Sequence, residues 1–411
     1  MISLEEAQAR IDRDISVLAP VRRPIGETRG QVLAESVSSA EAIPPFDNTA
    51  MDGFAVRASD TVGASEDAPV NIPVVATIAA GSVADRPLEA GEVMRIMTGA
   101  PMPDGADAVI MVELTRPAGE TAIELLAEVP VGNHVRPAGD DLSAGVVVFS
   151  PGEVITAGHI GVMASVGVAE VLVHPRPRVG VFSTGDELMV GPVELGPGQI
   201  RDSNRPTLLA LVEEAGCEAI DLGLLRDDEA VIEAALLGAV GAEGEDARVD
   251  VLLTSGGVSM GDFDFVKSVL GRLGDMNWMQ VAIKPAKPLA FGLLGSTPVF
   301  GLPGNPVSSM VSFELFARPG LRKMMGRPDT GRPMVMALAD EPLRRHNDDK
   351  THFQRVVVAQ QADGAWRVRS AGGQGSHQLS AMATANGLAV LPPSDGVDEG
   401  GVVRVMQLDL G

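Results

Sequence analysis

At three places in the chain, an apolar run typical of a buried strand leads directly into a glycine-containing turn and then into a helical pattern. These junctions lie at residues 178–187, 251–264 and 299–306. In the last of them Asn305 suits a helix N-cap and Pro306 suits the first helical position. Strands and helices alternate from about residue 175 to 326, which predicts βαβ units and a doubly wound parallel sheet with both faces covered.

The turns that follow these strands carry residue types that suit phosphate chemistry. Residues 255–264 read Ser-Gly-Gly-Val-Ser-Met-Gly-Asp-Phe-Asp, and residues 184–187 read Thr-Gly-Asp-Glu. Because ligands bind beyond the carboxyl ends of the strands in an open α/β sheet, we expect the three turns to converge on one site. Backbone N–H groups there suit an anion, and carboxylates suit a hard cation such as Mg²⁺. The alternative for any single turn is a tight connection that binds nothing, because glycine is first a residue for positive φ.

A paired-lysine segment, Lys284-Pro285-Ala286-Lys287-Pro288, stands out from an acidic chain. The sequence has 32 Lys and Arg against 55 Asp and Glu, a net charge of −23. The two prolines limit the freedom of the segment, so both ammonium groups are held near one place at a lower entropic cost. We interpret the segment as an anion site; the alternative is a surface loop with two solvated lysines.

Composition excludes several classes of protein. The acidic balance argues against a broad nucleic-acid footprint, and 3% aromatic residues without tyrosine do not make a base-stacking surface. The single cysteine, Cys217, excludes an intrachain disulfide framework, and we expect it to be buried. The six histidines show no metal-ligand spacing. We see neither a secretory signal at the N-terminus nor an apolar run of about 18 residues, so we expect a cytoplasmic protein that does not cross a membrane.

Residue patterns divide the 411 residues into four modules. Helical spacing follows Ser3 and a second helical pattern begins near Thr156, so we expect 1–43 and 139–174 to form one elongated, discontinuous domain. Short β-like runs between glycine and proline predict an inserted β-rich domain at 44–138. The α/β domain covers 175–326, and the β-like runs of 327–411 predict a C-terminal β-barrel.

Five segments, in order along nearly the whole chain, resemble a known family. They are 45–55 (Pro-Phe-Asp-Asn-Thr-Ala-Met-Asp-Gly-Phe-Ala), 95–103 (Arg-Ile-Met-Thr-Gly-Ala-Pro-Met-Pro), 255–264, 284–288 and 301–306 (Gly-Leu-Pro-Gly-Asn-Pro). Together they resemble molybdopterin molybdenumtransferase of the MoeA type, related to the gephyrin E domain.

The resemblance implies an L-shaped, four-domain subunit with a MoaB/MogA-like α/β domain. It implies a homodimer whose active site lies between the α/β domain of one subunit and the inserted β domain of the other. The implied reaction is insertion of molybdate into adenylylated molybdopterin with Mg²⁺ assistance and release of AMP, giving the molybdenum cofactor. Molybdopterin adenylyltransferase and molybdoenzyme chaperones are the implied partners.

The resemblance also assigns site residues. Implied catalytic residues are Asp52, Thr98, Glu187, Asp264 and Lys284. Implied contacts with adenylylated molybdopterin and molybdate are Ser255, Gly256, Gly257, Ser259, Lys284, Lys287, Pro303, Gly304, Asn305, Pro306, Arg355 and Ser380. Implied Mg²⁺ ligands are Glu187, Asp227, Asp228 and Asp264. Taken alone, Asp52 and Thr98 read as turn residues, and one of the Asp227-Asp228 pair reads as a helix N-cap.

Three positions depart from the family pattern, and two other functions stay open. Phe54 stands where tyrosine is common, Ala286 where glycine is common, and Gln280 where some relatives have a basic residue. The alternatives are a molybdopterin adenylyltransferase, which shares only the α/β domain, and a non-catalytic scaffold like the gephyrin E domain. The residues do not distinguish molybdate from tungstate, or the acid that binds metal from the acid that positions water.

Overall fold

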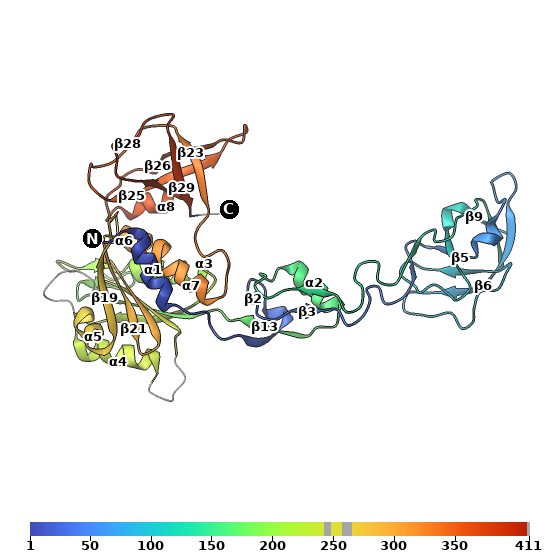
Figure 1. Cartoon of the computed structure of the whole chain (residues 1–411), viewed down its shortest axis with the longest axis horizontal. Coiled ribbons are helices and arrows are strands. Elements are labelled where there is room, and N and C mark those ends of the chain that lie inside the picture. Colours follow the sequence, from blue (N-terminus) through green and yellow to red (C-terminus); the bar gives the residue numbers. More distant parts are fainter. Residues whose placement is uncertain (242–247, 257–264, 409–411) are drawn as a thin grey trace. The chain divides into compact units, whose positions relative to one another are not determined.

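The computed structural model describes residues 1–241, 248–256 and 265–408 (Figure 1). The chain forms two compact units. The larger unit comprises residues 1–22, 30–34 and 172–411, and the smaller unit comprises residues 23–29 and 35–171. The finer boundaries at 43, 138, 174 and 326 stay predictions. Within the described ranges, no helix combines the length and the apolar character that a membrane crossing demands.

A six-stranded sheet in the order β17-β14-β18-β22-β21-β19 forms the base of the larger unit. Its strands are β14 (Arg178–Thr184), β17 (Glu218–Leu225), β18 (Val251–Ser255), β19 (Asp275–Gln280), β21 (Pro288–Leu294) and β22 (Thr297–Leu302). The first four strands in the spatial order are parallel, as predicted. The prediction of a wholly parallel sheet is wrong at one edge, where β21 is antiparallel to both β22 and β19. Only Gly295 and Ser296 separate β21 from β22, and a two-residue connection joins strands as a hairpin.

Helices cover both faces of this sheet. They are α3 (Asn204–Glu214), α4 (Glu229–Val240), α5 (Phe265–Leu273), α6 (Pro306–Ser312), the π-helical segment η4 (Phe313–Ala317) and α7 (Arg318–Met324). The side chains of β18 alternate between two cores, as a strand buried on both faces requires. Val251 and Leu253 pack in the core that contains Leu208 of α3, whereas Leu252 packs in the core that contains Ile232 of α4. The doubly wound architecture is therefore confirmed.

The N-terminal helix α1 (Leu4–Asp14) packs against the α/β core. Ser3 caps it, with its hydroxyl accepting a 3.0 Å hydrogen bond from the Glu6 backbone N–H. Its apolar face buries Ala7 and Ile11 in the same cluster as Phe300 of β22. The expected first domain, 1–43, begins with this helix, so its first residues belong structurally to the larger unit.

The C-terminal region is a closed five-stranded barrel, which confirms the predicted barrel. Its strands are β23 (Met334–Ala339), β25 (Thr351–Gln360), β26 (Trp366–Ser370), β27 (Gly387–Leu391) and β29 (Val402–Gln407). They follow the order β25-β26-β23-β29-β27, and pairing of β25 with β27 closes the barrel. A short strand of the lysine segment, β20 (Ile283–Lys284), adds in parallel to β25 and places Lys284 opposite His352.

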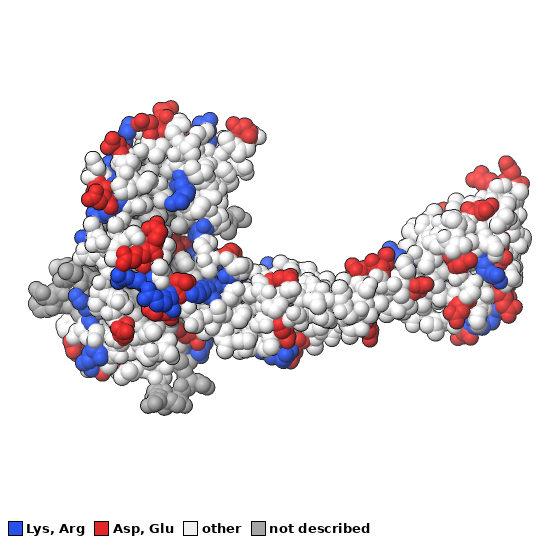
Figure 2. Space-filling view, in the orientation of Figure 1, with Lys and Arg blue, Asp and Glu red and all other residues white. Residues whose placement is uncertain are grey.

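Short elements complete the larger unit and its connections. They are β15 (Leu188–Met189), β16 (Ile200–Arg201), β24 (Leu343–Arg344), β28 (Gly396–Val397) and α8 (Leu379–Thr384), together with the three-stranded sheet of β1 (Val21–Pro24), β13 (Glu170–His174) and β2 (Val32–Leu33). Acidic and basic side chains intermix over the face shown in Figure 2. That distribution agrees with the absence of a broad basic footprint in the composition.

The smaller unit holds the predicted β-rich insertion. Its main sheet has the order β8-β5-β7-β6-β10-β9, formed by β5 (Gly53–Val56), β6 (Val70–Ile78), β7 (Val93–Ile96), β8 (Ala108–Met111), β9 (Thr115–Pro117) and β10 (Ala122–Leu125). Its shorter elements are η1 (Ile25–Glu27), β3 (Val37–Ser38), β4 (Asn48–Thr49), η2 (Ala58–Thr61), η3 (Val112–Leu114), β11 (Val135–Arg136), β12 (Val147–Phe149) and α2 (Ala157–Ser165). A Cβ at Gly53 would lie 2.2 Å from the Ile110 carbonyl oxygen, so the closeness of β5 and β8 requires glycine there.

Candidate functional site

The carboxyl ends of β14, β18 and β22 meet at one edge of the sheet. The register pairs Ser183 with Ser255 and Ser255 with Leu302. The three turns that the sequence predicts to converge therefore start side by side. Of the predicted residues in these turns, Gly257, Ser259 and Asp264 lie outside the described residues.

Asn204, at the first position of α3, joins two of the turns. Its side-chain amide donates to the Ser255 hydroxyl and to the Gly304 carbonyl, at 2.7 Å each. The Gly256 backbone N–H donates to the Leu302 carbonyl at 3.0 Å. Gly256 has a φ of 95°, a left-handed conformation that L side chains rarely adopt. These contacts tie the end of β18 at Ser255 and Gly256 to the end of β22 and the turn that follows it.

A pocket of about 700 Å³ opens between this sheet edge and the barrel, and we call it the lysine-loop pocket. Its lining is Ile283, Lys284, Pro285, Ala286, Lys287, Pro288, Pro303, Asn305, Ser308, Arg344, Arg345, His346, Lys350, His352, Phe353, Gln354, Gln374, Gly375 and Ser376. Lys284 and Lys287 are exposed. Asn305 occupies the N-cap position of α6, as predicted, but its side chain makes no capping bond and Asn305 lines the pocket instead. The structure therefore joins the lysine segment to the third turn.

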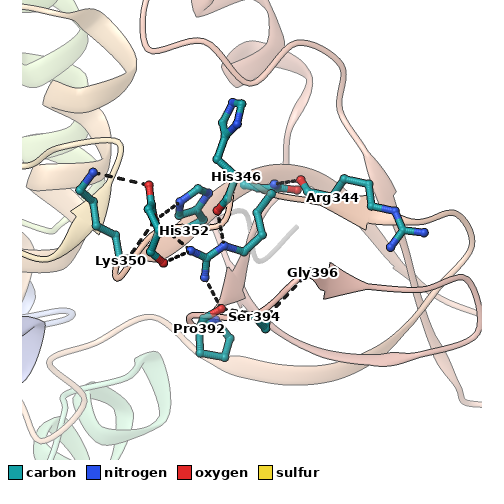
Figure 3. Close-up of polar contacts among 10 residues, drawn as sticks. Arg344, His346, Lys350, His352, Pro392, Ser394 and Gly396 are labelled. Carbon is teal, nitrogen blue, oxygen red and sulfur yellow. Dashed lines mark hydrogen bonds and ion pairs between the residues drawn. The ribbon is translucent and has the colours of Figure 1, made fainter.

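The barrel supplies a second group of basic residues to the pocket. Arg344, His346, Lys350 and His352 lie at this end of the barrel (Figure 3). Sequence reasoning missed them. A signal was present in the sequence, because Arg344-Arg345-His346 and Lys350 form a local group of basic residues like that of the lysine segment. The aspartates at 348 and 349 hide this group when only the net charge of the segment is counted.

Asp348 is the acid that contacts Arg345, Lys350 and His352. Its Oδ1 accepts hydrogen bonds from Arg345 Nη2 at 2.8 Å and from His352 Nε2 at 2.9 Å. Lys350 lies beside His352, with its Nζ 3.5 Å from Asp348 Oδ2 (Figure 3). Burial alone would raise the pKa of Asp348, but the hydrogen bond from His352 and the contacts with Lys350 outweigh it and lower the pKa to about 2. Burial lowers the pKa of His352, and the bond to Asp348 offsets this only in part.

Replacing Asp348 with asparagine should change how the stability of the larger unit depends on pH. Because the pKa of Asp348 is depressed in the folded protein, its contribution is complete above the unfolded value of about 4 and disappears as the pH falls through about 2. We expect wild type to lose stability more steeply than Asp348→Asn between these pH values. Urea unfolding followed by the fluorescence of Trp278 and Trp366 measures this, since both tryptophans lie in the larger unit.

Asp349→Asn is the matched control, because it removes the same formal charge from the adjacent, exposed position. Parallel pH profiles for Asp348→Asn and wild type, after subtraction of the Asp349→Asn effect, would contradict the prediction.

The predicted acids after β14 and β17 lie on two neighbouring loops. Asp186 and Asp227 face each other, since the Asp186 N–H donates to Asp227 Oδ2 at 3.3 Å and the Asp227 N–H donates to Asp186 Oδ1 at 3.4 Å. Asp228 caps α4, with Oδ1 accepting from the Val231 N–H at 3.0 Å. Glu187 is exposed in the same turn as Asp186. The helix-capping alternative is thus confirmed for Asp228, while Asp227 faces the Glu187 turn.

No three His, Cys, Asp or Glu side chains in the described part of the chain gather closely enough to hold a metal ion between them. Mg²⁺ in nucleotide sites usually keeps several waters and takes only one or two carboxylates together with phosphate oxygens. Exposed Glu187 and the neighbouring Asp227 are of that chemical type. Their role as Mg²⁺ ligands stays a prediction.

Arg355 and Ser380 are placed differently from the lysines. Arg355 is fully buried, and its Nη2 donates to the carbonyls of Gly373 at 2.6 Å and Gly375 at 3.1 Å. Burial lowers the pKa of this guanidinium. Gly375 and Ser376 line the lysine-loop pocket, so Arg355 positions a segment of its wall. Ser380 is exposed on the first turn of α8 and is not among the residues that line the pocket.

Asp52 and Thr98 of the smaller unit form one exposed pair. Asp52 Oδ1 accepts from the Thr98 hydroxyl at 2.6 Å and from the Thr98 N–H at 2.7 Å. These hydrogen bonds lower the pKa of Asp52. The two residues, 46 positions apart in sequence, therefore act structurally as a single anionic feature.

The three departures from the family pattern have distinct surroundings. Phe54 is buried, and the guanidinium carbon of Arg95 lies 5.3 Å from its ring centroid. Ala286 has a φ of 75°, which explains why glycine is common there, since an L side chain is strained in that region. Gln280 ends β19 and is not among the residues that line the lysine-loop pocket.

Comparison with known proteins accounts for the chain from end to end. Family models match residues 2–167 as the MoeA N-terminal region (domain I and II), 180–323 as a probable molybdopterin binding domain and 341–408 as the MoeA C-terminal region (domain IV). Molybdopterin molybdenumtransferase 2 of Mycobacterium tuberculosis is 39% identical over 398 residues, covering 95% of this chain and 96% of the relative. Molybdopterin molybdenumtransferase of Haemophilus influenzae is 37% identical over 399 residues, covering 96% of each.

A solved structure shows the same fold over the full length. The crystal structure of a molybdopterin biosynthesis MoeA protein from Pyrococcus horikoshii has a TM-score of 0.81 at 31% identity, covering 100% of this chain and 99% of that one. The full-length matches in sequence and in structure agree with the motifs, the doubly wound sheet and the closed barrel. The chain belongs to the molybdopterin molybdenumtransferase family.

Proposed function

We propose that this protein is a molybdenumtransferase of molybdenum cofactor biosynthesis, which inserts molybdate into adenylylated molybdopterin and releases AMP. The observation that carries the proposal is the lysine-loop pocket. In a chain with a net charge of −23, Lys284 and Lys287 meet Arg344 and Lys350 around one cavity of about 700 Å³. Molybdate and a phosphoanhydride are both anions, and such a cluster of cations attracts and orients them.

The arrangement supplies what anhydride cleavage requires from a protein. When the bond between the pterin phosphate and AMP breaks, negative charge grows on the leaving phosphate oxygen, and a fixed ammonium group stabilises that charge. Lys284 is fixed because β20 is paired to β25, and because the Thr351 N–H donates to the Ala282 carbonyl at 2.9 Å. Beyond β22, the Asn204 amide holds the Gly304 carbonyl, so α3 helps to position the turn that brings Asn305 to the pocket.

Mg²⁺ is proposed as the cofactor, and Glu187, Asp227 and Asp264 are the acids that would hold it, since the Asp228 carboxylate caps α4. When bound, it neutralises charge on phosphate oxygens. The residues of the chain do the rest: the acids place the ion, and the lysines bind the anionic groups of both substrates. Tungstate has the same shape and charge as molybdate, so both are proposed to enter the pocket.

We further propose that the active protein is a homodimer in which Asp52 and Thr98 of one subunit complete the site of the other. Both residues belong to the smaller unit, whereas the lysine-loop pocket belongs to the larger unit. The pair carries one anionic group that a metal or a water can use.

One experiment tests the reaction and the shared site together. Purified protein is mixed with adenylylated molybdopterin, Mg²⁺ and molybdate, and AMP release is measured with metallation of the pterin. We expect wild type to release AMP and the variants Asp52→Ala and Lys284→Ala each to be nearly inactive. After the two variants are unfolded and refolded together, about one quarter of wild-type activity should return, because half of the dimers are mixed and each has one intact site.

The outcomes separate the alternatives. Absence of AMP release by wild type removes the proposed reaction, and formation of adenylylated molybdopterin from ATP and molybdopterin would favour the adenylyltransferase. AMP release without any recovery in the mixed sample would reject the shared site and leave the reaction in place.

A further inference from the structure

A second cavity of about 1060 Å³ lies in the larger unit and shares no lining residue with the lysine-loop pocket. Its walls come from α3, η4, α7 and the segment 327–333 that leads into the barrel. Four arginines line it, Arg318, Arg322, Arg327 and Arg332, and we call it the arginine cavity. The motifs that define the family site contain none of these arginines.

Three of the four arginines donate hydrogen bonds to a carboxylate. Arg332 holds Glu314 with two hydrogen bonds of 2.8 Å, from Nε to Oε2 and from Nη2 to Oε1. Arg322 and Arg327 share Asp329, which accepts from Arg327 Nε at 3.0 Å and from Arg322 Nη2. Glu314 and Asp329 are therefore already engaged.

Arg318 is the exception, and it is also deeply buried. The residue is 5% exposed, and its Nε and Nη1 have no hydrogen-bond partner among the described residues. Glu314 Oε2 lies 3.8 Å from Arg318 Nε, beyond hydrogen-bonding distance. Burial and the charge of Arg332 together lower the pKa of Arg318 to about 10, and the charge of Glu314 offsets only part of this. The only counter-charge close to this guanidinium among the described residues is that of Glu314, which Arg318 shares with Arg332 and does not reach with a hydrogen bond.

The charged groups that line the cavity also leave an excess of positive charge. Besides Glu314 and Asp329, the lining contains one further acid, Glu214, which is 59% exposed and reaches Arg332 Nη2 only at 3.5 Å. Four guanidinium groups thus face three carboxylates. A buried charge is stable when it is paired and hydrogen-bonded, so the cavity suits one additional anion.

We propose that the arginine cavity is a binding site for a small tetrahedral oxyanion of the phosphate class, with Arg318 as its principal ligand. The planar fork of a guanidinium matches two oxygens of such an anion, and the neighbouring arginines add to the positive potential. The cavity lies apart from the site of the proposed function, so the inference does not depend on that function.

Binding of inorganic phosphate tests the proposal. The full chain is titrated with phosphate by calorimetry in chloride buffer at constant ionic strength, as wild type, Arg318→Met, Arg318→Lys, Lys284→Ala and the double variant Lys284→Ala/Arg318→Met. Lys284→Ala weakens the lysine-loop pocket, so the difference in phosphate binding between this variant and the double variant reports the arginine cavity. We expect one phosphate per chain in Lys284→Ala and at least a tenfold loss of that binding in the double variant Lys284→Ala/Arg318→Met.

Thermal unfolding gives a second readout that is independent of the calorimetry. Phosphate should raise the unfolding temperature of Lys284→Ala but not that of the double variant. In chloride alone, Arg318→Met should unfold no earlier than wild type, because methionine replaces a buried charge that lacks a partner. Arg272→Met, at an exposed arginine on α5, is the control for loss of one positive charge.

Two results would overturn the proposal. The first is an absence of phosphate binding in Lys284→Ala, and the second is binding that survives Arg318→Met unchanged. If Arg318→Met does not fold, Arg318→Lys decides the question, because lysine keeps the positive charge but lacks the planar guanidinium group. Phosphate binding that is as tight in Arg318→Lys as in the protein with Arg318 would reject the site. Failure of the lysine-loop pocket to bind substrate would leave these outcomes unaffected.

Discussion

Lys284→Ala is expected to lower kcat/KM for AMP release by about 100- to 1,000-fold, the range seen when one preorganised group that stabilises developing charge is removed. Lys284 is exposed at the pocket, but the backbone that carries it is not free to move. Ile283 is fully buried, and the register of β20 on β25 fixes Lys284 opposite His352. The backbone that carries the ammonium group is thus held in place before the substrate arrives.

The loss of activity should occur without loss of stability, because the Lys284 side chain is exposed. Circular dichroism and urea unfolding check this directly. Lys267→Ala is the control: this lysine lies on α5, 5.4 Å from the Trp278 ring centroid, and is not among the residues that line the lysine-loop pocket. Lys284→Arg should recover part of the activity, since it keeps the charge. A decrease of less than threefold for Lys284→Ala would remove Lys284 from the proposed mechanism.

Glu314→Gln is expected to reduce the free energy of unfolding of the larger unit by about 3–5 kcal/mol, the usual consequence of removing one partner from a buried ion pair. The side chains of Glu314 and Arg332 are 2% and 7% exposed. Glutamine has the shape of glutamate but no charge. The Arg332 guanidinium, next to that of Arg318, would then keep only its 3.5 Å contact with the exposed Glu214 carboxylate.

The chain offers a matched control for this prediction. Glu233 receives the same two-pronged contact from Arg272, at 3.0 and 2.7 Å, but these side chains are 30% and 51% exposed. Glu233→Gln should therefore change stability little, because solvent replaces the lost contact. Urea unfolding followed by the fluorescence of Trp278 and Trp366, both in the larger unit, measures both variants.

A double variant separates the loss of charge from the loss of packing. Glu314→Leu with Arg332→Met removes both charges and should be more stable than Glu314→Gln, since apolar groups can replace a buried pair at little cost. Equal effects of Glu314→Gln and Glu233→Gln would show that burial does not amplify this contact.

Local patterns predicted most of the elements on which the site is built. The apolar run before Ser255 and the Asn305-Pro306 start of α6 are read from neighbouring residues, because strand periodicity and helix starts are short-range properties. The N-cap of α4 at Asp228 was one of two readings for the same reason. The antiparallel edge of the sheet was missed, although the two-residue connection at Gly295 was a usable signal.

Contacts between distant segments were beyond this kind of reasoning. The sequence does not indicate that Asn204 would contact both Ser255 and Gly304, which lie 51 and 100 residues further along the chain. It shows Arg355 as a cation available to an anion, whereas the fold buries its guanidinium against two backbone carbonyls. A side chain's exposure depends on what packs over it, and the periodicity of its own strand leaves that undetermined.

The sequence by itself determined that strands ending in glycine turns would alternate with helices, that the lysine segment would be stiff, and that the chain resembles one family. Hydrophobic spacing and proline restrict the backbone over only a few residues, so their effects can be predicted from the sequence alone. Only the tertiary structure decided that β20 would pair with a barrel strand, bringing Lys284 to His352 and closing a pocket between segments more than 60 residues apart. It also decided that, of the four arginines in the arginine cavity, Arg318 would be the one without a hydrogen-bonded carboxylate, because the packing of whole elements determines which charges meet.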